Sequence, residues 1–279
     1  MTRARRLTRD SRTGRRRVLP WAVGGAVVGA LLAAVAAAPA RWLADAVADA
    51  SGQRLLLADA RGSVWSGSAV AVLAGGPGSR SASALPGRLK WTFGLAREDR
   101  SRVELRLRHE CCIDDQIRLR IEAGVGRLKL SLPAGRAALG RWPASWLVGL
   151  GAPFNSLRPG GTLRLVADGL AVETVQGRWR VSGLAELDLQ SLSSPLSTAD
   201  PLGSYRISVT GASSGGDGAG VALSTLQGPL RLTGTGQWAG PRLRFRGQAQ
   251  ADPGSEAPLN TLLNLLGPRQ GALALLAIG

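Results

Sequence analysis

The 279-residue sequence predicts a mainly β fold: an antiparallel, twisted β-sheet domain with few short helices, placed after one N-terminal transmembrane helix. Three observations predict this class. Residues 18–40 carry no charge, apolar and polar residues alternate along much of the chain after them, and glycine precedes several alternating segments. Alternation with a period of two is typical of strands that bury one face. We therefore expect a basic tail over residues 1–17, the transmembrane helix over residues 18–40 and a β-rich domain over residues 41–279.

The charge-free run is long enough to cross a membrane as a helix. Its 23 residues would span about 35 Å, and the hydrocarbon core of a bilayer is about 30 Å thick. Eight arginines lie within the first 17 residues, and basic segments beside a first transmembrane helix tend to stay in the cytoplasm. The sequence therefore predicts a single-pass protein of the inner membrane whose bulk is periplasmic. Ala36–Ala38 leave a cleaved signal peptide as the alternative, although the run exceeds the roughly 7 to 15 residues of a usual signal-peptide core.

Gly25 and Gly29 form a G-x-x-x-G pair inside this run. Small residues at this spacing let two transmembrane helices pack closely. The pair therefore predicts helix self-association and a homo-oligomer, although a segment rich in glycine and alanine also produces such a pair by chance.

Alternation defines the predicted strands. In residues 102–108, Val103, Leu105 and Leu107 share one face, and charged residues occupy the other. The same period recurs in residues 117–121, 128–132, 207–209, 230–232 and 243–246. We expect most of these predicted strands to pair with the next strand along the chain in an antiparallel way.

Turns and two helices complete the expected fold. A glycine, one further residue, then leucine, a cation and an apolar residue predict a turn leading into a strand. This pattern begins at Gly87, Gly126, Gly161 and Gly228. Leucines at helical spacing predict a helix over Leu259–Leu266, and a second helix is expected near Ala134–Leu150, where Pro143 interrupts it. Loops are expected over residues 75–83, 195–201 and 211–220.

The chain is strongly basic, with a formal net charge of +16. Its basic residues stand singly along the predicted strands instead of clustering with aromatic residues, so nucleic acid is not an expected partner. Anionic lipid headgroups or an acidic protein fit better. The alternative is a solvated strand face in a protein that uses arginine widely, since Lys90 and Lys129 are its only lysines.

Little in the sequence supports catalysis. His109 is the only histidine, so the sequence offers almost no material for a catalytic triad or a histidine-based metal cluster. At the end of a predicted strand beside Glu110, we expect it to be solvated or hydrogen-bonded. Gly211–Gly215 matches G-x-S-x-G, but more glycines follow it instead of a helix. Gly234–Ala239 matches a dinucleotide-binding pattern, yet it leads into a predicted strand. We expect no enzyme activity, no cofactor and no metal.

Cys111 and Cys112 are the only cysteines. An oxidising compartment favours a disulfide between them, but adjacent side chains in a strand point to opposite faces, so the bridge requires a turn. Residues 110–115 lie between two predicted strands and provide one. The prediction is a vicinal disulfide that stiffens this loop, with free or intermolecularly paired thiols as the alternatives.

Three segments, taken in order after the basic tail and the charge-free run, resemble a known family. They are Arg61–Ala69 (RGSVWSGSA), Leu85–Trp91 (LPGRLKW) and Leu259–Gly271 (LNTLLNLLGPRQG). Together they resemble the N subunit of type II (general) secretion systems. The resemblance implies a bitopic inner-membrane protein whose periplasmic domain belongs to the machine that exports folded proteins through the outer membrane. It implies other secretion-system subunits as partners and supplies no catalytic residues.

The leading functional hypothesis is therefore a non-enzymatic subunit of this machinery, anchored in the inner membrane. The alternative is a module that binds or handles envelope lipid, somewhat like the AsmA-type envelope proteins. It arises because two short helices cannot cover the apolar face of about a dozen one-sided strands. The sheet must then fold over on itself, pair with a partner or hold membrane lipid.

Overall fold

The computed structural model describes residues 15–96, 102–175, 178–211, 218–239 and 242–279. The chain separates into two compact units, residues 1–39 and residues 40–279. The first unit contains helix α1 (Arg15–Ala36), whose large apolar side chains from Trp21 to Val35 are exposed. Among the residues that the structure describes, no helix combines the length and hydropathy needed to cross a membrane. The anchor over residues 18–40 stays a prediction.

The second unit is built on one antiparallel sheet, as predicted. Its path runs β1-β2-β4-β5-β6-β7-β9-β10-β11-β12-β13-β14-β16-β15, with β3 paired to β2 and β8 paired to β9. The strands are β1 (Leu55–Gly62), β2 (Ser66–Ala74), β3 (Ala82–Ala84), β4 (Leu89–Leu95), β5 (Val103–His109), β6 (Ile117–Gly124), β7 (Arg127–Ser131), β8 (Arg136–Pro143), β9 (Gly160–Val175), β10 (Arg178–Ser193), β11 (Gly203–Gly211), β12 (Ala219–Gln227), β13 (Leu230–Ala239), β14 (Arg242–Ala251), β15 (Arg269–Gln270) and β16 (Leu273–Ile278). Neighbouring strands are mostly consecutive in the chain, which is why short glycine turns suffice to join them.

The predicted alternation holds for the middle of β5 but not for its start, where Val103 is 38% exposed and Glu104 only 7% exposed. Leu105 of β5 lies opposite Leu119 of β6, and Arg106 lies opposite Arg118. The four predicted turn glycines all have positive φ values. Residues 195–201 connect β10 to β11, as expected. Residues 75–81 connect β2 to β3, whereas residues 82 and 83 of the predicted loop belong to β3. Of the predicted loop over residues 211–220, positions 212–217 lie outside the described residues, while Gly211 belongs to β11 and residues 219–220 belong to β12.

The helix expected near Ala134–Leu150 is wrong for its first half. Residues 136–143 form β8, which pairs with β9, and only residues 144–150 are helical, as the short 3₁₀ helix η1 (Ala144–Leu150). Pro143 lacks a backbone donor and cannot sit inside a helix, so the helix begins after it. The residues before Pro143 satisfy their backbone groups by pairing with β9 instead.

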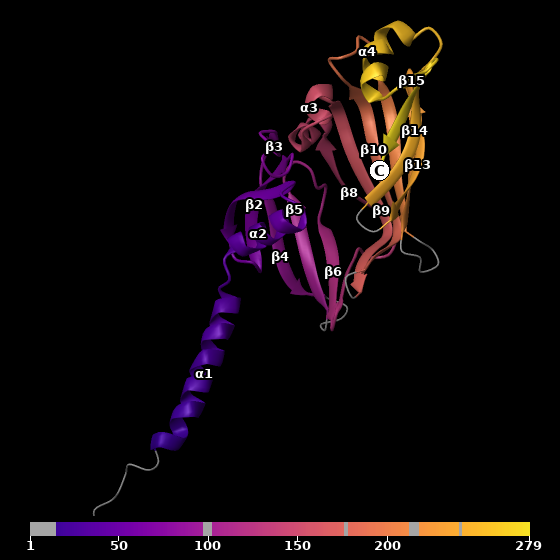
Figure 1. Cartoon of the computed structure of the whole chain (residues 1–279). Coiled ribbons are helices and arrows are strands. Elements are labelled where there is room, and N and C mark those ends of the chain that lie inside the picture. Colours follow the sequence, from indigo (N-terminus) through magenta and orange to yellow (C-terminus); the bar gives the residue numbers. More distant parts are fainter. Residues whose placement is uncertain (1–14, 97–101, 176–177, 212–217, 240–241) are drawn as a thin grey trace, which may run out of the picture. The chain divides into compact units, whose positions relative to one another are not determined.

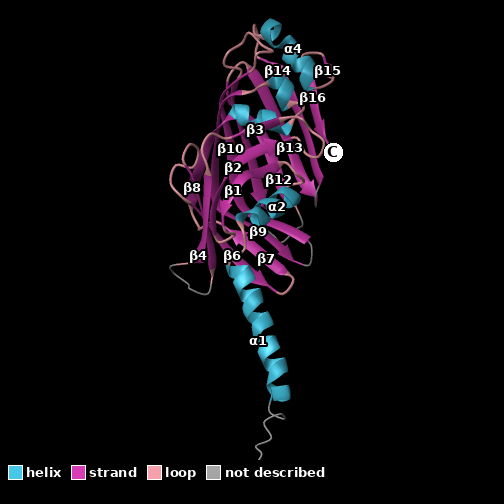
Figure 2. Cartoon of the chain, turned by 90° about the vertical axis from the view of Figure 1, so that its left-hand side faces the viewer, coloured by secondary structure: helices cyan, strands magenta, loops and turns pink. Residues whose placement is uncertain are grey.

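The remaining helices are α2 (Ala40–Ala50), α3 (Phe154–Leu157) and α4 (Glu256–Leu266). The α4 helix confirms the prediction from the leucine spacing. It lies against β14 and β16 (Figure 1) and buries Leu259, Leu262 and Leu263 over the sheet. The α2 helix lies against β1 (Figure 2), and its Leu43 packs beside the buried Trp91. The helices α2 and α4 therefore each contribute to a local core at a different part of the sheet.

Candidate interaction site

Four cations meet in a hollow of about 440 Å³ on the polar face of β4, β5 and β6. We call it the cationic hollow, and its lining residues are Lys90, Thr92, Arg106, Arg108, Gln116 and Arg118. Antiparallel register brings the cations together, because Lys90 lies directly opposite Arg108 and Arg106 directly opposite Arg118. The sequence placed basic residues on this face but spaced them singly, so the cluster was not predicted.

Carboxylates neutralise only part of the cationic hollow. Lys90 Nζ lies 2.7 Å from Glu110 Oε1, and Arg106 Nε lies 2.7 Å from Glu104 Oε1. The hydrogen bond from Lys90 lowers the pKa of Glu110, so this carboxyl stays ionised at neutral pH. Arg108 donates a hydrogen bond of 3.2 Å to the neutral amide oxygen of Gln116. Within the described parts of the chain, Arg118 has no ionic or hydrogen-bonded partner.

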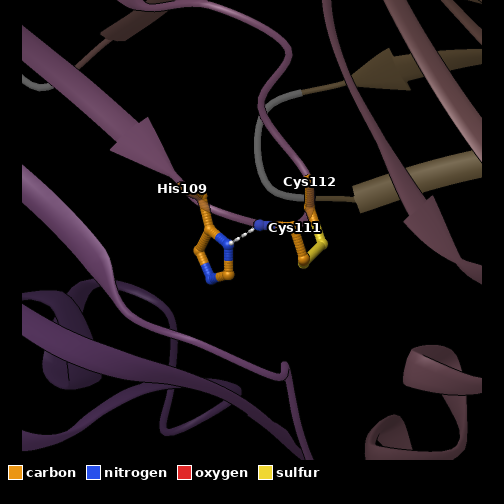
Figure 3. Close-up of a disulfide and its surroundings, with 3 residues drawn as sticks. All are labelled: His109, Cys111 and Cys112. Carbon is orange, nitrogen blue, oxygen red and sulfur yellow. Dashed lines mark hydrogen bonds between the residues drawn. A yellow bond between two sulfur atoms is a disulfide. The ribbon is translucent and has the colours of Figure 1, made fainter.

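A turn carrying both cysteines follows β5 beside this hollow. The structure joins Cys111 to Cys112 through their sulfur atoms, and the backbone leaves the extended form here, as a vicinal bridge requires. Cys111 is exposed, and Cys112 is only 3% exposed. The backbone N–H of Cys111 donates to His109 Nδ1 at 3.3 Å (Figure 3). The oxidation state of the two cysteines in the cell stays a prediction.

The cysteine turn is attached to β8. The backbone N–H of Arg141 donates to the carbonyl of Cys112 at 2.9 Å, and the Arg141 guanidinium lies 3.2 Å from Asp114. A Cβ at Gly140 would lie 2.1 Å from the Cys112 carbonyl oxygen, so only glycine allows this approach. The turn therefore links β5 and β6 to β8, and we expect the disulfide to rigidify that joint.

His109 is part of the same joint and is only 5% exposed. Burial lowers its pKa, which favours the neutral imidazole, although Glu110 acts in the opposite direction. Its Nε2 atom has no hydrogen-bond partner within the described residues. The ligand atoms of His109, Cys111 and Cys112 lie within 4.8 Å of one another, a proximity that sequence reasoning did not predict. While the sulfurs are joined, neither is a free thiolate.

Counting thiols tests the predicted bridge. We expect the full chain, unfolded without reductant, to take up no iodoacetamide, because both sulfurs are bonded to each other. After reduction it should take up two equivalents, which intact-protein mass spectrometry resolves and which serves as the positive control. Labelling of both residues without reductant would refute the bridge, and a covalent dimer on a non-reducing gel would indicate intermolecular pairing instead.

The other predicted positions fall apart from this region. A Cβ added at Gly25 or Gly29 would meet no other atom within 4 Å, so this helix face is open, and self-association stays a prediction. Gly234–Ala239 lies inside β13 and is no phosphate-binding turn. Most of the G-x-S-x-G match over residues 211–215 lies outside the described residues.

Comparison with known proteins supports the family suggested by the three sequence segments. Neither the curated proteins nor the solved structures give a match to this chain. One family model, described as type II secretion system (T2SS), protein N, matches residues 53–275. This match spans nearly the whole sheet from β1 to β16, so the chain belongs to the family of type II secretion system protein N.

Proposed function

We propose that this chain is a non-enzymatic subunit of the type II secretion machinery, anchored in the inner membrane with its sheet domain in the periplasm. The observation that carries the proposal is the family match over residues 53–275, which covers the sheet and leaves the N-terminal run outside it. That run carries no charge over residues 18–40 and follows eight arginines, an arrangement typical of an uncleaved anchor with a cytoplasmic start. The domain then contacts other subunits of the machine.

Reporter fusions test the proposed topology. Alkaline phosphatase fused after Gly279 should be active, because that enzyme works only on the periplasmic side, and a fluorescent protein that folds only in the cytoplasm should stay dark there. An N-terminal epitope tag should remain with the chain in the membrane fraction. Dark phosphatase with bright fluorescence would overturn the topology, and loss of the tag would favour the cleaved signal peptide.

Gene deletion tests the proposed role. We expect loss of the gene to lower the amount of type II substrates in the medium and to raise their amount in the periplasm. The wild-type gene supplied in trans should restore export. Export that is unchanged by the deletion would contradict a role in the machinery.

A second candidate function, lipid handling, is favoured by the uneven cover of the apolar sheet face. On the apolar face of β4 the exposed fraction of the residue rises from 2% at Trp91 to 58% at Leu95. Leu95 lies opposite Val103, which is 38% exposed.

Lipid extraction and mass spectrometry of the purified full chain test this function, with Leu95→Glu plus Val103→Glu as the comparison. Phospholipid retained by the wild type and lost by the variant would support it, and equal amounts in both would contradict it.

A further inference from the structure

The cationic hollow contains facing pairs of like charge. Lys90 opposite Arg108 forms one row across the strands, and Arg106 opposite Arg118 forms the next. Directly opposed like charges destabilise a sheet. Most other opposed charges in the same sheet differ in sign, as between Glu122 and Lys129, and the like pair of Arg141 and Arg164 stands as a single row. A sequence that keeps two adjacent rows of cations therefore lowers its own stability at this place, which is expected of a binding surface.

The spacing of the two rows indicates the shape of the ligand. Within a strand, residues two apart are separated by about 6.6 to 6.8 Å. An extended polypeptide presents alternate side chains at the same spacing, so two acidic residues separated by one other residue match the two rows. A single phosphate group would reach only one row.

Among the described residues, the two cations of the hollow that have no carboxylate partner are both accessible, and Lys90 is exposed as well but is already paired with Glu110. Arg108 and Arg118 are both exposed, whereas Arg106 is half-buried beside Glu104. Guanidinium groups bind carboxylates through paired hydrogen bonds, and such charge-assisted bonds are stronger than neutral ones. An incoming carboxylate would thus engage groups that the folded chain leaves unneutralised.

We propose that the cationic hollow binds an extended acidic segment of a partner protein, with carboxylates at alternate positions lying over the rows of Lys90–Arg108 and Arg106–Arg118. The proposal rests on the proposed function in one respect, which is that the partner is another subunit of the machinery. Binding is expected to weaken as salt is added, because the contact is exposed to solvent.

Fluorescence anisotropy with the purified full chain tests the proposal. The probe is a labelled synthetic peptide in which glutamate alternates with serine, and its isomer has the same glutamates in one block. We expect the alternating peptide to bind more tightly than the isomer. Arg108→Gln plus Arg118→Gln should weaken its binding by about tenfold or more, because two charge-assisted contacts are lost. The matched control, Arg244→Gln plus Arg246→Gln, removes the same charge from the exposed side of β14 and should not change binding.

Thermal unfolding gives a second readout. Arg108→Gln plus Arg118→Gln removes one cation from each facing pair, so its Tm should equal or exceed that of the wild type, and weaker peptide binding then cannot be ascribed to misfolding. A lower Tm would contradict the argument from like charges.

Three other results would overturn the proposal. The first is equal binding of the two peptide isomers. The second is an equal effect of the β14 control variant. The third is Arg108- and Arg118-dependent binding of inorganic phosphate or anionic phospholipid vesicles without binding of the peptide. Failure of the proposed function can be told apart from failure of this proposal. Unchanged export after gene deletion would contradict the function and leave a positive peptide-binding result intact.

Discussion

Replacing Trp91 by alanine is expected to lower the free energy of unfolding of the sheet domain by about 3 to 5 kcal/mol. Trp91 is 2% exposed and lies in the cluster formed by α2, β2 and β4. Its indole Nε1 also donates to the carbonyl oxygens of Ser63 and Val64, at 3.3 and 3.0 Å. The ring therefore fills the local core and holds the connection between β1 and β2 at the same time.

Urea unfolding of the full chain, followed by circular dichroism, measures this change. The matched control is Trp238→Ala, because Trp238 is 41% exposed on β13 and leaves no comparable cavity. Trp91→Phe should lie between the wild type and the alanine variant, since it keeps an aromatic ring but loses both hydrogen bonds. Equal losses for the Trp91 and Trp238 alanine variants would show that this cluster is not a core.

The strands predicted from the sequence are those whose two faces differ clearly in polarity. The alternation in residues 102–108 and 117–121 was sufficient to predict β5 and β6. The 16-residue strand β10 was harder to anticipate, because Gly183 interrupts the pattern. The structure shows that Gly183, with φ of 85°, shifts the register against β9 without ending the strand. A glycine that signals a turn and one that allows a bulge are alike in the sequence.

The candidate site was predictable in its local part only. The adjacency of Cys111 and Cys112 and their position between two strands are properties of the sequence, so the turn was expected. The cationic hollow depends on which strands are neighbours and on their register. A shift of the β5–β6 register by one residue would place Arg106 opposite an apolar side chain and remove the facing pair. Burial of His109 likewise depends on packing between distant segments.

Asp188→Asn is expected to have the second large effect, a loss of about 3 kcal/mol in the free energy of unfolding at neutral pH, because it breaks a buried ion pair from one side. Asp188 is 3% exposed in the middle of β10. Its two carboxylate oxygens accept hydrogen bonds of 2.6 and 3.0 Å from Arg206 on β11, and Arg164 of β9 lies opposite it on the other side. The variant keeps the shape of the side chain and leaves Arg206 without its charged acceptor.

The pH dependence of this loss provides the sharper test. Hydrogen bonding to Arg206 lowers the pKa of Asp188 below its ordinary value of 3.8. The carboxylate therefore contributes its full stabilisation above pH 3.8, the value in the unfolded chain, and loses it as the pH falls through the lower pKa of the folded state. Urea unfolding of the wild type and the variant should thus show a difference in the free energy of unfolding that is constant near neutral pH and shrinks below about pH 4.

Asp252→Asn is the control, because Asp252 pairs with Arg231 at the surface, and its effect should be much smaller. A difference for Asp188→Asn that persists unchanged into acid would mean that packing of the side chain, and not its charge, stabilises the centre of the sheet.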